Sequence, residues 1–192
     1  MNALSQLSNL ENLDVSYNVL TSIDPIGTCK KLVGLNASHN RITSLGTLDN
    51  LTGLTVLNLS SNSLSNVDIL GSCAALVDLD VSKNTIGSIS GFASLDHLEI
   101  LNFSNNQVET LPEWKEDCRL RSIDGSYNQV ASVSPMQVLQ KLTHVFMDYN
   151  LITSVDDLEK CYNLVQVNVY GNDIDTVAAL TEHDIIVNYD PT

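Results

Sequence analysis

An asparagine recurs every 22 residues through almost the whole chain, at Asn18, Asn40, Asn62, Asn84, Asn106, Asn128, Asn150 and Asn172. A leucine eight residues before each asparagine keeps the same phase, from Leu10 to Leu164. The first of these segments, LENLDVSYNVL, fits the pattern L-x-x-L-x-L-x-x-N-x-L. Self-similarity at a fixed period of this length is typical of repeat architectures. We therefore expect one small structural unit to be stacked eight times.

Each repeat contains the pattern of a short strand followed by a tight turn. The alternation in Leu57-Asn58-Leu59 predicts a strand with one buried face. Two further apolar columns lie five and eight residues beyond each asparagine, and their spacing of three predicts a 3₁₀ turn on the outer side. Because a single repeat cannot bury its apolar edge alone, the units must stack into a solenoid whose strands form a parallel sheet.

This pattern resembles the leucine-rich repeat family over nearly all of residues 4–190. The repeat length is similar to that of the subclass shared by bacterial internalins and a eukaryotic phosphatase-regulatory subunit. The resemblance implies a leucine-rich repeat solenoid of the α/β class, a curved right-handed horseshoe with a concave parallel β-sheet. We expect residues 1–192 to form a single domain of eight full repeats with partial repeats at both ends. Ile186, in phase with Leu164, predicts a final strand, and we expect the chain to be a fragment of a longer protein.

The recurring asparagines and the serines near them have a structural explanation. An asparagine amide both donates and accepts hydrogen bonds, so it can satisfy main-chain groups that a turn leaves unpaired. We assign all eight asparagines to stability and not to ligand binding. The serines at Ser16, Ser38, Ser60, Ser82, Ser104 and Ser126 are expected to bond locally as well.

The charge balance excludes several classes of partner. The chain has 9 Lys and Arg against 23 Asp and Glu, a formal net charge of −14. A nucleic-acid-binding protein needs a basic face to neutralise phosphates, and so does a protein that docks on anionic membranes. No apolar stretch approaches the roughly 20 residues that span a bilayer. We expect no nucleic-acid partner and no membrane insertion.

Cysteine positions predict free thiols. Cys29, Cys73 and Cys161 occupy a repeat position where other repeats have Leu, and they lie at least two repeats apart. Two repeats correspond to about 10 Å, which is too far for a disulfide. Cys118 is one residue out of phase, since Asp117 holds the expected position. We therefore expect an altered outer turn over residues 111–118 and a less protected thiol at Cys118.

The sequence favours a bacterial protein at the cell surface or secreted, although a cytoplasmic location stays open. The sequons at Asn36, Asn58 and Asn102 would place glycans on the concave face. With unpaired cysteines as well, this argues against a eukaryotic secretory pathway. The internalin-like end of the array favours the bacterial alternative.

No residue pattern predicts catalysis, a cofactor or a metal. Ser122 and His144 share a strand position in adjacent repeats, with Asp124 nearby, but an open sheet offers neither a buried acid nor an oxyanion hole. Asp14, Asp78, Asp80 and Asp124 form a spaced line on the concave face, whereas a hard cation needs six or more oxygens held tightly. We expect a solvated acidic face on a protein that is not an enzyme.

One outward strand column carries the functional signal. It is Asp or Asn in seven of eight repeats and Phe146 in the other. We predict an exposed Phe146 with no core duty, and aromatic side chains dominate interface hot spots. The predicted partner-binding residues are Tyr127, His144, Phe146, Tyr149, Tyr170 and Asp124. The alternative is that these side chains only pack among themselves.

These features predict a monomeric, non-enzymatic protein–protein interaction module that binds a protein partner on its concave face. The acidic positions around the patch favour a partner with a basic rim. The resemblance implies an internalin-like surface adhesin or a receptor-type binding domain. Two alternatives stay open: a cytosolic regulatory or scaffold subunit similar to the phosphatase-regulatory protein, and a structural spacer between flanking domains.

Overall fold

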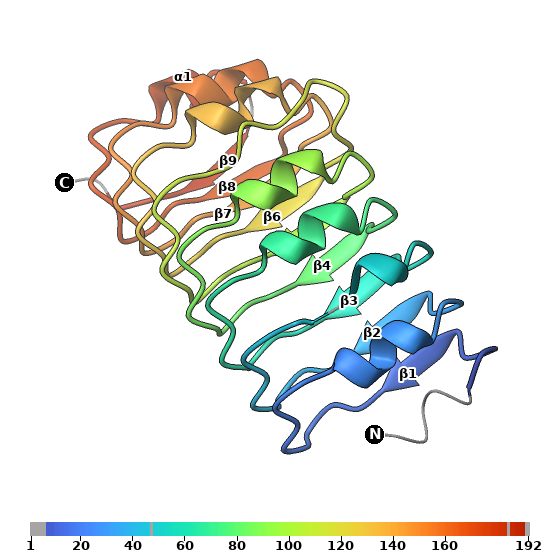
Figure 1. Cartoon of the computed structure of the whole chain (residues 1–192). Coiled ribbons are helices and arrows are strands. Elements are labelled where there is room, and N and C mark those ends of the chain that lie inside the picture. Colours follow the sequence, from blue (N-terminus) through green and yellow to red (C-terminus); the bar gives the residue numbers. More distant parts are fainter. Residues whose placement is uncertain (1–6, 47, 184, 191–192) are drawn as a thin grey trace.

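A single parallel sheet runs through the whole molecule. The structure is a computed structural model that describes residues 7–46, 48–183 and 185–190. The chain coils as a curved solenoid, and each coil adds one strand at the edge of the sheet (Figure 1). The strands are β1 (Asn12–Asp14), β2 (Gly34–Asn36), β3 (Val56–Asn58), β4 (Asp78–Asp80), β5 (Ile100–Asn102), β6 (Ser122–Asp124), β7 (His144–Phe146), β8 (Gln166–Asn168) and β9 (Ile186–Asn188). They pair in sequence order, as the repeat predicts.

The register follows the 22-residue period up to β8 and then changes. Leu35 pairs with Leu57, and this spacing continues along the sheet. At the last step Ile186 pairs with Gln166, so the final coil is two residues shorter. The predicted final strand is therefore present, but its phase was wrong. Ile186 takes an outward position and is 57% exposed, whereas Leu164 is buried.

Short helices form the outer side of the solenoid, as the spacing of three predicts. The 3₁₀ helices are η2 (Asp24–Thr28), η3 (Leu48–Asn50), η4 (Asp68–Ser72), η5 (Ser90–Ser94), η6 (Ser134–Val138) and η7 (Asp156–Lys160), and α1 (Ala178–Thr181) is a single α-helical turn. In η4 the residue before the helix, Val67, and the third helical residue, Leu70, are both fully buried. A 3₁₀ turn brings residues three apart onto one face, so both apolar columns reach the core.

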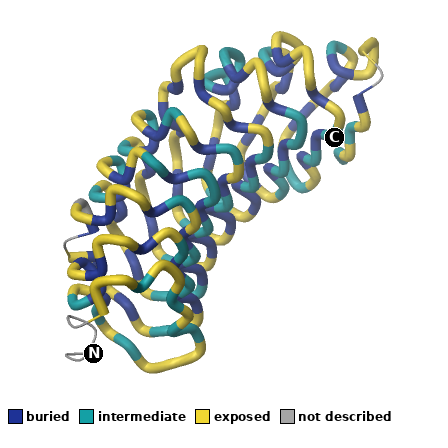
Figure 2. Tube along the Cα trace, turned by 90° about the vertical axis from the view of Figure 1, so that its right-hand side faces the viewer, coloured by how far each residue is buried: buried dark blue, intermediate teal, exposed yellow. Residues whose placement is uncertain are grey.

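The core is a continuous ribbon between the sheet and the outer turns. Figure 2 shows buried positions along the inside of every coil and exposed positions around the outside. The two apolar columns beyond the asparagines are buried throughout, including the largest members, Phe92 and Trp114, whereas Leu10 and Leu13 of the first coil are only partly buried. Each coil buries its apolar edge against the next, which is the reason that the array requires stacking.

The coil over residues 111–118 has no helix between η5 and η6, as the out-of-phase cysteine predicts. Trp114 still reaches the core. The expectation of a less protected thiol at Cys118 was wrong. Its side chain is 2% exposed, while Asp117 lies in solvent. Without a helix the outer turn follows an irregular path, and the inward position moves by one residue. Burial raises the pKa of the Cys118 thiol.

The repeated asparagines join neighbouring coils, which confirms their structural assignment. Asn62 Oδ1 accepts the N–H of Ile42 at 2.9 Å. Its Nδ2 donates to the carbonyls of Ala37 and Leu59, both at 3.0 Å. From Asn40 to Asn172 each such amide satisfies turn groups of its own coil and of the coil before it, whereas Asn18 donates only within its own coil among the described residues.

Candidate functional site

Two rows of side chains point outward from the concave face of the sheet. The first row is Asn12, Gly34, Val56, Asp78, Ile100, Ser122, His144, Gln166 and Ile186, and the second is Asp14, Asn36, Asn58, Asp80, Asn102, Asp124, Phe146, Asn168 and Asn188. Successive members of a row lie on neighbouring strands, about 4.8 Å apart. A partner laid across the sheet would contact these rows.

The second row is polar from β1 to β6 because the turn after each of these strands uses its side chain. Asn36 Oδ1 accepts the main-chain N–H of Ser38 at 3.1 Å and its hydroxyl at 2.8 Å. Asp124 Oδ1 accepts the N–H of Ser126 at 3.0 Å. The main-chain N–H of each of the six serines donates to the side chain two residues earlier, which confirms that they bond locally. The run of Asp and Asn is therefore a turn motif, and Asp124 combines a predicted binding role with a structural one.

Phe146 interrupts this motif, and the coil around it is rearranged. The residue two positions later is Asp148 in place of a serine, and its Oδ1 accepts the N–H of Tyr170 in the next coil at 2.8 Å. The Phe146 ring lies 6.2 Å from the His144 ring on the same strand. The expectation of an exposed Phe146 was wrong, since the side chain is half-buried. It occupies an outward position of β7 beside His144, on the concave side of the sheet.

The tyrosines lie beyond the strand ends, along the rim of the sheet. Tyr127 and Tyr149 each precede a repeat asparagine and have positive φ values of 59° and 53°. Their rings stack at 4.5 Å with an interplanar angle of 17°. Tyr170 meets Tyr149 edge-on at 5.6 Å. The six predicted residues thus form two aromatic groups, a pair on β7 and a row of three at the rim, with Asp124 on the neighbouring strand β6.

The sequence prediction missed a second stacked pair at the other end of the rim. Tyr17 and His39 stack at 4.1 Å with an interplanar angle of 8°. They occupy the same repeat position as Tyr127 and Tyr149, the residue before the asparagine. Comparing this position across all repeats would have found them. Both ends of the rim therefore present aromatic surface.

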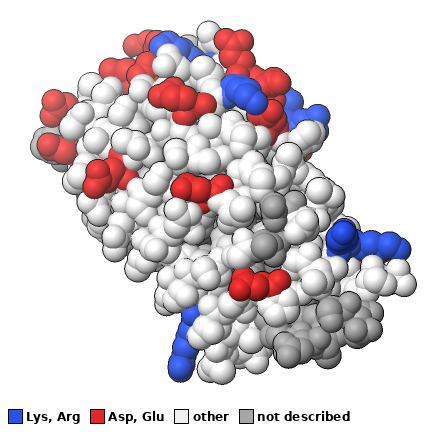
Figure 3. Space-filling view, viewed as in Figure 1, with Lys and Arg blue, Asp and Glu red and all other residues white. Residues whose placement is uncertain are grey.

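Negative charge dominates the concave face. The two outward rows hold Asp14, Asp78, Asp80 and Asp124 and, over the nine described strands, neither Lys nor Arg. Burial raises the pKa of Asp148, and the nearby Asp124 and Asp190 raise it further against the lowering effect of the Tyr170 N–H. In the view of Figure 3, acidic side chains are most frequent toward the C-terminal end of the molecule.

The arrangement offers no assembled catalytic or metal site within the described residues. Ser122 and His144 are register partners, but no hydrogen bond joins them to each other or to Asp124. The His144 ring instead lies against the Thr143 hydroxyl at 2.9 Å. In the same part of the chain, no group of three or more His, Cys, Asp or Glu side chains is placed to hold a metal ion. Nor does any helix there have the length and apolar character needed to cross a membrane.

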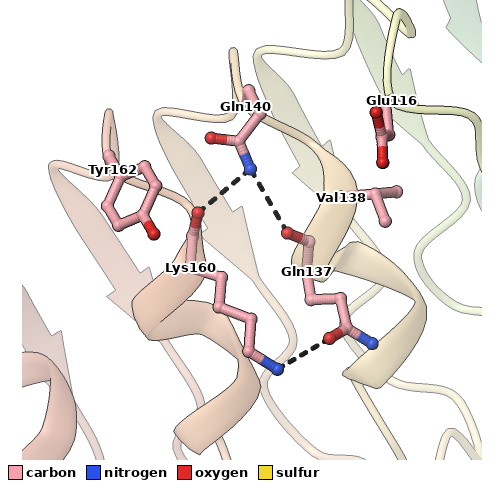
Figure 4. Close-up of a pocket in the computed structure, with 6 residues that line it drawn as sticks. All are labelled: Glu116, Gln137, Val138, Gln140, Lys160 and Tyr162. Carbon is pink, nitrogen blue, oxygen red and sulfur yellow. Dashed lines mark hydrogen bonds between the residues drawn. The ribbon is translucent and has the colours of Figure 1, made fainter.

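A hollow of about 440 Å³ lies among the outer turns of the C-terminal half (Figure 4). Lys160 Nζ donates to Gln137 Oε1 at 2.7 Å, and Gln140 Nε2 donates to the Lys160 carbonyl at 3.1 Å. These polar groups satisfy one another across neighbouring coils. We therefore interpret the hollow as a gap between neighbouring coils that the lining side chains bridge.

Comparison with known proteins places this geometry among repeat proteins. A family model described as leucine-rich repeats (2 copies) matches residues 8–50, 30–72 and 74–116. The crystal structure of internalin C2 from Listeria monocytogenes is similar at 29% identity over 97% of this chain and 83% of that one, with a TM-score of 0.91. No curated protein sequence matched the chain.

Two further solved structures are similar in fold at lower identity. Internalin F from Listeria monocytogenes is 24% identical over 99% of this chain and 57% of its own, with a TM-score of 0.92. The ectodomain of the Arabidopsis thaliana receptor kinase GASSHO1/SCHENGEN3, solved with CASPARIAN STRIP INTEGRITY FACTOR 2, is 20% identical over 95% of this chain and 24% of that chain, with a TM-score of 0.79.

Proposed function

Since the chain belongs to the leucine-rich repeat family, a family fold that suggests protein–protein interaction, we propose that it binds a protein partner through the C-terminal half of its concave face. We define the aromatic patch as Tyr127, His144, Phe146, Tyr149 and Tyr170, bordered by Asp124. The proposal includes no catalytic step. By likeness to the internalins, the proposed setting is a bacterial surface or secreted adhesin.

The observation that carries the proposal is the replacement at Phe146. In the six coils before it, the residue at this position supplies the turn acceptor, as Asn36 and Asp124 show. At Phe146 the chain gives up that acceptor and places a half-buried ring on the concave side. An aromatic ring that supplies no turn hydrogen bond is best explained by what it contacts outside the fold.

The rim tyrosines extend the same surface. Tyr127, Tyr149 and Tyr170 are 51%, 44% and 47% exposed. Stacking holds their rings in place before a partner arrives, so less conformational entropy is lost on binding. The acidic residues around them favour a partner with a basic rim, and that contribution should act mainly on the association rate.

The test compares Phe146→Asn with the wild-type protein in partner capture and then in quantitative binding. Asn restores the residue that the column carries elsewhere, so the variant should fold normally. Affinity should fall by about 2 kcal/mol or more, which is roughly 30-fold. Tyr162→Ala is the matched control, because Tyr162 is an aromatic residue that is 81% exposed outside the concave rows.

Equal affinity for Phe146→Asn, Tyr162→Ala and wild type would place the binding site elsewhere. If neither wild type nor any variant captures a protein, the molecule acts as a spacer and the proposal is wrong.

A further inference from the structure

The N-terminal half of the concave face carries a second surface that the aromatic patch does not include. Four register partners on β2, β3, β4 and β5 form this surface, namely Gly34, Val56, Asp78 and Ile100. We call these four positions the apolar row, after its two aliphatic members. Val56 and Ile100 are each 46% exposed. These two aliphatic side chains point away from the core, so packing within the fold does not explain them.

Gly34 opens a hollow at one end of the apolar row. The hollow measures about 620 Å³, and its lining includes Asn12, Val33, Gly34, Val56 and Asn58. Gly34 does not have a positive φ, so the backbone does not require glycine there. A Cβ at this position would come within 2.6 Å of Asn12 Oδ1. What glycine supplies is therefore space between Asn12 and Val56.

Asp78 lies between the two exposed aliphatic side chains without a partner. No described residue donates a hydrogen bond to its carboxylate or forms an ion pair with it. Burial and the neighbouring Asp80 both raise its pKa. By contrast, the Asp80 carboxylate accepts the N–H of Ser82 at 2.9 Å. A half-buried carboxylate that the fold leaves unpaired is stabilised by a cation from outside.

The negative charge of the concave face favours a basic segment as the ligand of the apolar row. The outward rows hold four Asp and no Lys or Arg over the described strands. Lys and Arg side chains combine an aliphatic stem with a cationic end, which matches an exposed aliphatic side chain next to a carboxylate. An acidic or purely apolar segment would leave Asp78 unpaired and desolvate it further.

We propose that the apolar row docks an extended basic segment of the partner protein. An aliphatic side chain of this segment fills the hollow at Gly34. The aliphatic stem of an Arg or Lys lies on Val56 or Ile100, and its cationic end pairs with the Asp78 carboxylate. This inference rests on the proposed function and specifies the chemistry of the partner. It adds a contact area separate from Phe146, on the opposite half of the face.

The experiment uses a defined probe, the peptide acetyl-Arg-Val-Arg-Val-Arg-amide, and follows the methyl signals of Val56 and Ile100 by NMR. A second peptide replaces each Arg with citrulline, which keeps the shape and removes the charge. We expect the Arg peptide to shift both methyl groups saturably and the citrulline peptide to bind about tenfold more weakly. Added salt should weaken the Arg peptide more than the citrulline peptide.

Two variants locate the contact. Asp78→Asn should weaken the Arg peptide about tenfold, and Gly34→Ala should weaken both peptides by filling the hollow. Asp156→Asn is the control for net charge, because Asp156 is an exposed residue of η7 on the outer side. It should leave both affinities unchanged.

Equal binding of the two peptides would overturn the role of Asp78. Equal weakening by Asp78→Asn and Asp156→Asn would show that the peptide senses only net charge, and shifts centred on Phe146 would move the basic segment to the aromatic patch. Each of these three results overturns the proposal. Because the peptides stand in for the natural partner, a negative result with them does not decide the test of Phe146→Asn in the proposed function.

Discussion

Asn150 Oδ1 accepts the main-chain N–H of Val130, 20 residues earlier in the chain, at 2.9 Å. The same amide donates through Nδ2 to the carbonyls of Gly125 at 3.0 Å and Met147 at 3.1 Å. Asn150 is 6% exposed, so water cannot replace these hydrogen bonds. One side chain thus holds the main chain of two adjacent coils together.

Asn150→Ala should lower the free energy of unfolding by about 3 kcal/mol, because it leaves buried main-chain groups without partners. Urea denaturation followed by circular dichroism measures the change. Asn18→Ala is the control, since Asn18 is exposed and donates only to Val15 and Ser16 of its own coil among the described residues. Its loss should stay below about 1 kcal/mol. Equal losses would mean that the bonds between coils do not contribute.

Gly125→Ala should destabilise the fold by about 1–3 kcal/mol through overpacking. Gly125 does not need its backbone freedom, because its φ is not positive. It needs space, since a Cβ there would run into the Phe103 ring and Met147 Sδ. Gly87→Ala is the matched control, because a Cβ at Gly87 would meet nothing within 4 Å. A thermal melt of both variants checks this, and an unchanged Tm for Gly125→Ala would contradict it.

All four cysteines should react slowly with a thiol reagent in the native protein and completely in denaturant. Cys29, Cys73, Cys118 and Cys161 form no disulfide, and all four are buried. Burial raises the pKa of Cys161 to about 11, so little thiolate forms at neutral pH. Time-resolved alkylation with mass spectrometry reads each site. Rapid native labelling of Cys118 would restore the expectation that its thiol is less protected.

Asp78→Asn should raise the Tm at pH 7. Burial and Asp80 hold the Asp78 pKa above its ordinary 3.8, so the folded state binds this proton more tightly than the unfolded chain. Stability is therefore lost as the pH rises through the folded pKa, and the full cost is present above it. The gain in Tm should shrink as the pH falls and vanish below 3.8. Asp156→Asn should show no gain, and a lower Tm for Asp78→Asn would refute the assignment.

Much of the architecture could be read from the sequence, because a solenoid repeats one local environment. The repeated asparagines indicated where the turns lie. The two apolar columns beyond them, to which Val67 and Leu70 belong, indicated the core. Even the missing helix near Trp114 was visible as a phase error at Cys118. The aromatic residues around Phe146 could be predicted as neighbours for the same reason, since residues one period apart lie on adjacent strands.

Only the tertiary structure decided what each of these side chains does within its column. It showed that Asp124 is a turn acceptor, that Phe146 is half-buried and that Cys118 turns inward. It also separated the tyrosine rim from the strand face, because the residue before each asparagine adopts a positive φ. Period alone fixes which residues are adjacent. Burial and hydrogen bonding depend on the exact path of the backbone through each turn, and that path is set by packing against the neighbouring coils.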